Sequence, residues 1–289
     1  MPHDTARTVI LAKTAGFCMG VGLALRKLDK AVAESTGRIF THGPIIHNPQ
    51  VLARYESLGV RQLASDIQAG AGDTVVVRAH GIPLAEQKAL EALGVRVVDA
   101  TCPKVKKAQV LIAEQAAQGR TLLLFGEPEH PEVKGLVSYA RGQSMIFDSV
   151  DGLREALAGR ISGQCFFLAA QTTQARDMFG RVREVVLDLC GEETPILDTI
   201  CDATKERQEE VVEIAAQVEA MVVVGGKNSG NTRRLAAVAR ESGVFCVHVE
   251  TAGELAGALN PEYRVVGLAA GASTPGDIIE EVRQALLAS

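Results

Sequence analysis

The sequence, 289 residues long, lacks several features that mark common classes of protein. It has no surplus of basic residues, because its formal net charge is −5, so nothing favours nucleic acid or an anionic membrane surface. Its apolar runs, such as Thr74–Val77 and Thr121–Phe125, are strand-sized and too short to cross a bilayer. Its start, MPHDTARTVILAK, has no signal-peptide pattern. We therefore expect a cytoplasmic protein that binds neither nucleic acid nor membrane.

The six cysteines include no C-x-x-C pair, which removes the usual signature of a zinc ribbon or a thioredoxin-like enzyme. A disulfide framework does not suit a reducing compartment. The glycine-rich segment GGKNSGNT lacks the spacing of a Walker loop, and no dinucleotide-binding fingerprint is present. What the sequence has instead is solitary cysteines, widely separated along the chain.

Short β-type runs alternate with longer amphipathic stretches along the chain. Runs such as Cys165–Ala169 and Met221–Val224 are strand-like, whereas Lys104–Gln118 and Glu206–Val218 are apolar at helical spacing. This alternation predicts an α/β fold with mostly parallel sheets. Sites in such folds gather beyond the carboxyl ends of the strands, so the residues that follow each strand matter most.

A threefold repeat is visible in those positions. Asp99-Ala-Thr-Cys102 and Asp198-Thr-Ile-Cys201 have the same form, and Cys18 occupies the equivalent place after Ala15-Gly-Phe. Polar loops centred on His47, His130 and Asn228 follow the three cysteines after 29, 28 and 27 residues. We therefore predict three α/β units, at residues 9–98, 99–197 and 198–289, packed around a shared centre.

Each of these three cysteines precedes a predicted helix. A helix N-terminus carries partial positive charge and free amide donors, which favour thiolate over thiol. Pro103 suits a first helical position. Thiolates bind iron–sulfur clusters or zinc, and three cysteines would leave one iron of a cubane open to substrate. Spacing alone also allows a three-cysteine zinc site completed by histidine. We expect the other three cysteines to be small core residues: Cys165, Cys190 and Cys246.

The polar loops supply groups for anions and for proton transfer. Strand-to-helix turns rich in Gly, Ser and Asn expose backbone amides that cradle phosphate. His130-Pro-Glu132 stands out, because the proline stiffens a turn that could present an imidazole and a carboxyl to one spot. A carboxyl beside an anionic cluster and an anionic substrate should have a raised pKa and could stay protonated, ready to donate.

Several segments taken together resemble one family, the 4-hydroxy-3-methylbut-2-enyl diphosphate reductases. The segments occur in order along nearly the whole chain: GFCMGV, HGPIIHN, RAHG, DATCPKV, HPEVKG, QTT, CDATKERQ, GGKNSGN and AGASTP. The resemblance implies a trefoil of three pseudo-repeated α/β units around a central [4Fe–4S] cluster with three cysteine ligands. It implies the cluster ligands Cys18, Cys102 and Cys201. It implies the catalytic groups Glu132, His130, Thr172 and Thr173. It implies the substrate-binding residues His47, His80, His130, Thr173, Ser229, Gly230, Asn231 and Ser273.

The reaction implied is the reductive removal of an allylic hydroxyl from a small diphosphate, which gives isopentenyl and dimethylallyl diphosphate. Many family members carry a serine where this chain has Gly230, so only a backbone amide could contact the diphosphate there. Electrons would come from a transient external donor of the ferredoxin or flavodoxin class, because no flavin or nicotinamide motif is present.

Three other functions fit parts of the pattern. An aconitase-like hydro-lyase would use the same open cluster but would turn over without a reductant. A non-catalytic iron–sulfur sensor would leave the polar loops without a role, and the acidic balance does not favour DNA. A zinc enzyme using the same thiolates would be colourless.

Overall fold

The computed structural model describes residues 7–63, 69–142, 144–161 and 163–288. The prediction that the chain begins without a signal peptide concerns MPHDTARTVILAK, and residues 1–6 of this segment lie outside the described residues. The chain forms two compact units, each described by itself. The terminal unit comprises the described residues up to Val21, His47–Leu52 and the described residues from Asp202 onward. The central unit comprises Gly22–Ile46 and the described part of Ala53–Cys201.

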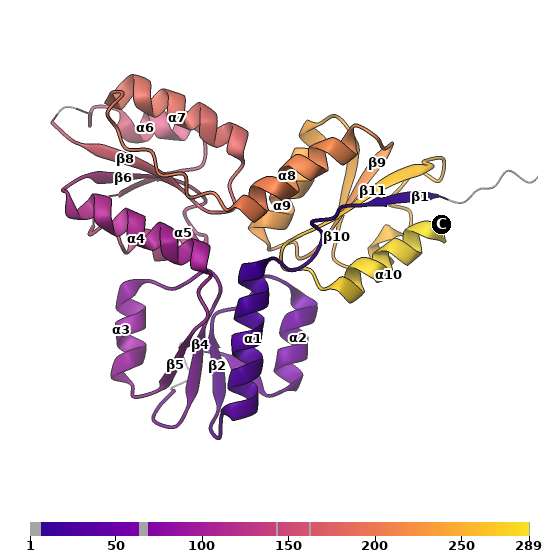
Figure 1. Ribbon diagram of the computed structural model, residues 1–289, viewed down its shortest axis with the longest axis horizontal. Helices are drawn as coiled ribbons and strands as arrows, with labels where there is room; N and C mark the ends of the chain where they lie inside the picture. The colour runs from indigo at the N-terminus through magenta and orange to yellow at the C-terminus, as the bar shows by residue number, and fades with distance from the viewer. Residues whose placement is uncertain (1–6, 64–68, 143, 162, 289) are drawn as a thin grey trace, which may run out of the picture. The chain divides into compact units, whose positions relative to one another are not determined.

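The terminal unit contains one parallel sheet with the strand order β1-β11-β9-β10 (Figure 1). Its elements are β1 (Thr8–Leu11), α8 (Asp202–Ala215), β9 (Ala220–Val224), α9 (Gly230–Glu241), β10 (Phe245–Val249), the 3₁₀ helix η1 (Ala252–Leu255), β11 (Val265–Ala270) and α10 (Gly276–Leu287). β9 is buried along its whole length, as expected for a central strand of a parallel sheet covered on both faces. Met221 and Val223 pack with residues of α8 and α9, whereas the alternate residues of β9 pack with α10.

The central unit contains two parallel sheets, with the strand orders β3-β2-β4-β5 and β7-β6-β8. The elements of the first sheet's half are α1 (Met19–Glu34), β2 (Ile39–His42), α2 (Pro49–Ser57), β3 (Val60–Gln62), β4 (Thr74–Val77), α3 (Leu84–Ala92) and β5 (Arg96–Asp99). Those of the second are α4 (Pro103–Ala117), β6 (Thr121–Phe125), α5 (Pro131–Val137), β7 (Ser144–Phe147), α6 (Val150–Leu157), β8 (Phe166–Ala170) and α7 (Arg176–Cys190). The first turns of α1 and α2 are counted with the terminal unit.

Strands β6 and β8 form the core of the second sheet, and both are buried throughout. One face packs against α4 and α5, the other against α6 and α7, as Figure 1 shows. The alternation of side chains along each strand divides the two faces, since Leu122 and Leu124 belong to one cluster and Leu123 and Phe125 to the other.

Parallel sheets with helices on their faces confirm the predicted α/β class, and the three sheets agree with a chain built from three α/β units. The sheet order differs from the sequence-based division in one respect. β1 falls within the predicted unit 9–98 but pairs with β11, in register from Thr8 with Val265 to Leu11 with Leu268. The boundaries of the three predicted units stay a prediction. No helix in the described part of the chain has the length and apolar character needed to span a membrane.

Candidate functional site

In the central unit, the predicted site residues follow the carboxyl ends of parallel strands. His80 follows β4, His130 and Glu132 follow β6, and Thr172 follows β8. Because β6 and β8 are hydrogen-bonded neighbours in parallel register, their loops emerge at the same edge of the sheet. The topology therefore brings the HPE turn and the threonine pair together, as expected for a site in an α/β fold.

Glu132 is a buried carboxyl held by Thr172. Its side chain is 1% exposed. The backbone amide of Thr172 donates to Oε1 at 2.7 Å, and the Thr172 hydroxyl lies 3.0 Å from Oε2. Burial raises the pKa of Glu132 to about 7, although the two contacts with Thr172 act in the opposite direction. The sequence led us to expect a raised pKa, but from anionic neighbours; in the structure, loss of water is the main cause.

His130 begins α5 and orients the turn that carries Glu132. It is the N-cap residue, and its Nδ1 atom accepts a hydrogen bond from the Glu132 amide at 3.1 Å. Pro131 fills the first helical position, where its missing N–H costs nothing. Because Nδ1 accepts, a neutral His130 ring carries its proton on Nε2. The rings of His80 and His130 meet edge to face, with centroids 5.4 Å apart.

Thr173, the second residue of the threonine pair, is half-buried and lies beside Thr172. Its hydroxyl accepts a hydrogen bond from Nε2 of Gln171 at 3.2 Å. Gln171 in turn binds the amide of Glu127 through Oε1, at 3.0 Å. The loop after β6 and the loop after β8 are therefore hydrogen-bonded to each other at Glu127 and at Glu132.

Two of the three predicted ligand cysteines lie in the central unit. Cys102 is the N-cap residue of α4, and Pro103 occupies the first helical position as predicted. The amide of Cys102 donates to the Ala79 carbonyl at 2.9 Å, directly before His80. The amide of Cys201 donates to the Thr172 carbonyl at 3.0 Å. Both cysteines are half-buried, and each backbone is anchored to a loop that carries another predicted site residue.

Cys18 lies in the terminal unit, immediately before the first residue of α1. Its Sγ atom accepts a hydrogen bond from the Val21 amide at 3.5 Å, and its own amide donates to the Ala272 carbonyl at 3.2 Å. The thiol therefore lies at the N-terminus of α1, in contact with a backbone amide of its first turn. All three cysteines directly precede a helix, which confirms this part of the sequence prediction.

The loop after β9 carries the other polar groups of the terminal unit. Ser229 is the N-cap residue of α9, and its Oγ atom accepts from the Thr232 amide at 3.4 Å. Gly230 and Asn231 form the first positions of the helix. The Asn231 Nδ2 atom is buried and has no hydrogen-bond partner among the described residues. A helix N-terminus beside an unused amide donor is a favourable place for a phosphate group.

Three loops of the terminal unit meet at the backbone of His47. The Ser273 hydroxyl donates to the His47 carbonyl oxygen at 3.3 Å. Gly226 approaches the same oxygen so closely that a Cβ atom on it would lie 2.4 Å away. The predicted residues His47, Ser229 and Ser273 are thus carried by loops that touch one another. The close approach depends on glycine at position 226, where the backbone itself has no unusual φ.

The other cysteines do not all behave as expected. Cys246 is buried and Cys190 is half-buried at the end of α7, but Cys165 is exposed. The expectation that Cys165 is a core residue is wrong, because β8 begins at Phe166 and Cys165 lies just outside it. Within the part of the chain that the structure describes, none of the six cysteines is in a disulfide.

Sequence reasoning gave no role to Thr232, which is fully buried in the first turn of α9. Its Oγ1 atom would be 2.0 Å from a Cβ atom at Gly271 and 3.0 Å from one at Gly225. The two glycines at the ends of β9 and β11 therefore make room for Thr232. In the sequence, only the glycines that follow these strands could have indicated that another side chain packs closely there.

Comparisons with known proteins identify the family. The family model described as LytB protein matches residues 9–287. A protein from Nitratidesulfovibrio vulgaris (strain DSM 19637 / Miyazaki F), named 4-hydroxy-3-methylbut-2-enyl diphosphate reductase, is 57% identical over 278 residues, which cover 96% of this chain and 98% of the relative. A protein of the same name from Aquifex aeolicus is 41% identical over 284 residues, covering 95% and 94% of the two chains.

Solved structures agree. A structure of (E)-4-hydroxy-3-methyl-but-2-enyl diphosphate reductase, described as the terminal enzyme of the non-mevalonate pathway, is 38% identical, with a TM-score of 0.69; the match covers 98% of this chain and all of the other. The E-1-hydroxy-2-methyl-but-2-enyl-4-diphosphate reductase from Plasmodium falciparum is 23% identical with a TM-score of 0.91, covering 96% and 87%, and supports the fold alone. The sequence, the sheets and these likenesses lead to one conclusion: the chain belongs to the LytB protein family.

Proposed function

We propose that this chain catalyses the reductive dehydroxylation of 4-hydroxy-3-methylbut-2-enyl diphosphate to isopentenyl diphosphate and dimethylallyl diphosphate. The C–O bond of the allylic alcohol breaks, two electrons and two protons are consumed, and water leaves. The reaction is the last step of the methylerythritol phosphate route to isoprenoids. The observation that carries the proposal is the buried Glu132 carboxyl, whose pKa of about 7 keeps a proton available near neutral pH.

The LytB family uses an iron–sulfur cluster, and the thiols of this chain fit one. Cys18, Cys102 and Cys201 are half-buried, and each precedes a helix. Soft thiolates at such positions suit iron, and three of them would hold one [4Fe–4S] cluster with one iron left open. When bound, such a cluster supplies electrons one at a time and polarises the leaving oxygen as a Lewis acid.

Residues of the central unit would donate a proton to the leaving oxygen of the substrate. The Thr172 amide donates to Oε1 of Glu132, which leaves Oε2 as the oxygen that carries the acidic proton. The Thr172 hydroxyl donates to Oε2 at 3.0 Å. When Oε2 is protonated, this hydroxyl would instead accept from it, so the proton could pass from Oε2 through Oγ1 of Thr172 to the substrate oxygen. His130, with its proton on Nε2, would orient the terminal hydroxyl of the substrate together with Thr172, and Thr173 would line the site beside Thr172.

The residues of the terminal unit would hold the diphosphate. Ser229, Asn231 and Ser273 are each at most 7% exposed and offer hydroxyl or amide donors. Gly230 contributes a backbone amide at the N-terminus of α9, where the helix dipole favours anions. We propose that His47 and His80 complete the diphosphate contacts. A transient ferredoxin or flavodoxin would deliver the electrons.

The test is an anaerobic assay with the hydroxylated allylic diphosphate and a chemical reductant, with the products separated. We expect both five-carbon diphosphates, formed only when reductant is present. Turnover without reductant would indicate a hydro-lyase instead. A colourless, zinc-loaded protein after anaerobic purification would contradict the cluster, and iron and sulfide analysis measures this directly.

A further inference from the structure

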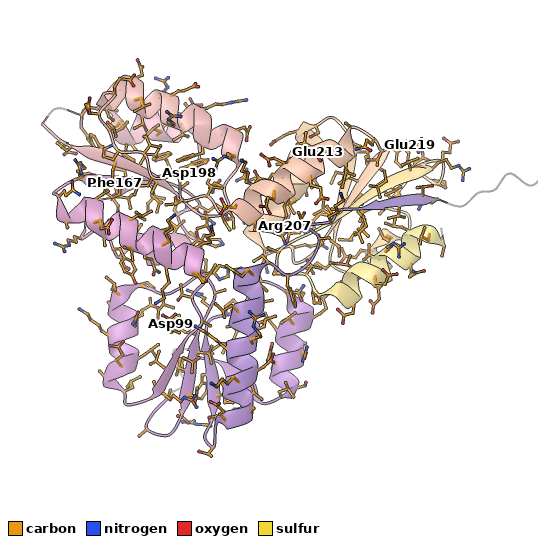
Figure 2. The ribbon with its side chains drawn as sticks, viewed as in Figure 1. Asp99, Phe167, Asp198, Arg207, Glu213 and Glu219 are labelled. Carbon is orange, nitrogen blue, oxygen red and sulfur yellow. The ribbon has the colours of Figure 1, made fainter. Side chains whose placement is uncertain are left out.

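The segment that follows Cys201 carries two charged residues to which the proposed reaction gives no role. Arg207 and Glu210 lie one turn apart on α8, within the terminal unit. Arg207 lies in the N-terminal half of the helix, beside the segment that leads away from β1 (Figure 2). Their contacts converge on the loop between β1 and Cys18.

Glu210 accepts three hydrogen bonds from two neighbouring residues of that loop. Its Oε1 atom receives the Lys13 amide at 2.6 Å, and its Oε2 atom receives the Thr14 amide at 2.9 Å. The Thr14 hydroxyl donates to Oε2 as well, at 2.6 Å. A carboxylate that accepts three donors in this way fixes the backbone of both residues, because hydrogen bonds to a charged acceptor are stronger than neutral ones.

Arg207 holds the next part of the loop. Its side chain is only 5% exposed, and Nη2 donates to the Gly16 carbonyl oxygen at 2.8 Å. Nη1 donates to the Ala203 carbonyl at 2.9 Å, one helical turn earlier. Gly16 has a φ of +105°, a conformation that other residues rarely adopt, and lies two residues before Cys18. The guanidinium therefore connects the start of α8 to the turn of the loop that requires glycine at position 16.

Burial removes the Arg207 guanidinium from water, so its interactions must offset a desolvation cost. An arginine used for packing alone could be replaced by an apolar residue of similar size. The hydrogen bond from Arg207 to the Gly16 carbonyl is the contact through which its side chain can affect the loop before Cys18.

We propose that Arg207 and Glu210 are positioning residues that hold the loop before Cys18 in the conformation in which its thiol can serve as a metal ligand. The inference rests on the ligand role of Cys18 in the proposed function. Lys13, Thr14 and Gly16 are held from α8, while the Cys18 amide is held by Ala272, so both ends of the turn are tethered.

The test compares Arg207→Met and Glu210→Gln with two matched controls on the same helix. Lys205→Met removes an exposed positive charge, and Glu213→Gln alters an exposed carboxyl three residues beyond Glu210. Two properties of each full-length protein are measured. One is the alkylation rate of each cysteine in the metal-free chain, followed by mass spectrometry; the other is the rate of iron loss from the anaerobic holoprotein in the presence of a chelator.

We expect Cys18 to be alkylated about tenfold faster in both variants. Losing a charge-assisted hydrogen bond makes the loop between β1 and Cys18 leave its folded conformation more often, which exposes the thiol to the reagent. Cys102 and Cys201 should react at the wild-type rate, iron should be lost faster, and both controls should match the wild type. An unchanged Cys18 rate, or equal acceleration of all three thiols, would overturn the proposal.

Faster alkylation of Cys18 with an unchanged rate of iron loss would contradict the role of Cys18 as a metal ligand. It would leave intact the inference that α8 positions the loop before Cys18. If Arg207→Met fails to fold, Glu210→Gln decides the matter alone. Glutamine keeps the shape of the side chain, but it loses the charge and replaces one accepting oxygen with an NH2 donor, so one loop amide loses its acceptor.

Discussion

The close approach of Gly226 to His47 leads to a prediction whose size follows from the geometry. In Gly226→Ala, the new Cβ atom would lie 2.4 Å from the His47 carbonyl oxygen, whereas ordinary van der Waals contact begins at 3.4 Å. The two backbones must therefore separate by about 1 Å. A displacement of about 1 Å in a substrate-positioning group can lower catalytic efficiency about 100-fold. Because His47 is proposed to bind diphosphate, we expect most of the loss to appear as a raised KM.

The assay measures kcat and KM for the allylic diphosphate under anaerobic conditions, with the melting temperature recorded for each variant. The matched control is Gly276→Ala, at the start of α10, where a Cβ atom would meet nothing within 4 Å. The control should keep the wild-type KM. An unchanged KM in Gly226→Ala, with the fold intact, would refute the idea that this approach places His47. A loss confined to the melting temperature would give the glycine a purely structural role.

Four further outcomes are expected. Glu132→Gln should lower kcat by about 10²- to 10⁴-fold through loss of the proton donor, with KM and iron content unchanged; a wild-type rate would contradict the assignment. Because the pKa of Glu132 is raised in the folded state to about 7, its favourable contribution to the free energy of unfolding is complete below pH 4.5 and is lost as the pH rises to about 7. The loss amounts to about 3 kcal/mol, which chemical denaturation at several pH values should detect. Glu132→Gln should remove this pH dependence. Thr172→Val should keep the amide contact to Glu132 but lose the hydroxyl, so kcat should fall with little change in KM; an unaffected kcat would exclude the hydroxyl from the proton path. Cys102→Ala should lose most of its iron, whereas the exposed Cys165→Ser should retain it; full iron content in Cys102→Ala would remove it from the ligand set.

Local sequence signals predicted the parts of the site that depend on neighbours in the chain. The helix after Cys102 could be recognised because Pro103 suits a first helical position, and it begins there. The turn that presents His130 and Glu132 could be recognised from its proline for the same reason. Such features need only a few consecutive residues to specify them.

Contacts between distant segments could not be predicted in this way. Thr172 binds Glu132 across 40 residues, and nothing in the composition of either loop indicates the pairing. Burial of Glu132 follows from that packing, so the cause of its raised pKa could not be deduced either. Glu210 reaches Thr14 across 196 residues, and its role on an otherwise ordinary amphipathic helix has no local signature. The predicted strand Cys165–Ala169 begins one residue before the observed β8, which starts at Phe166, so Cys165 lies outside the strand.

The pairing of β1 with β11 has a consequence for biosynthesis. A ribosome makes Thr8 long before it makes the partner residue Val265, because most of the residues described here lie between them. The first strand must therefore stay unpaired while the central unit is already complete enough to fold, since segments fold in the order in which they emerge. The segment that bears Cys18 directly follows β1, so it reaches its final position only after β11 has been synthesised. Metal loading that requires Cys18 would then follow the synthesis of β11, and ribosome-bound chains stalled before Val265 should carry no complete cluster.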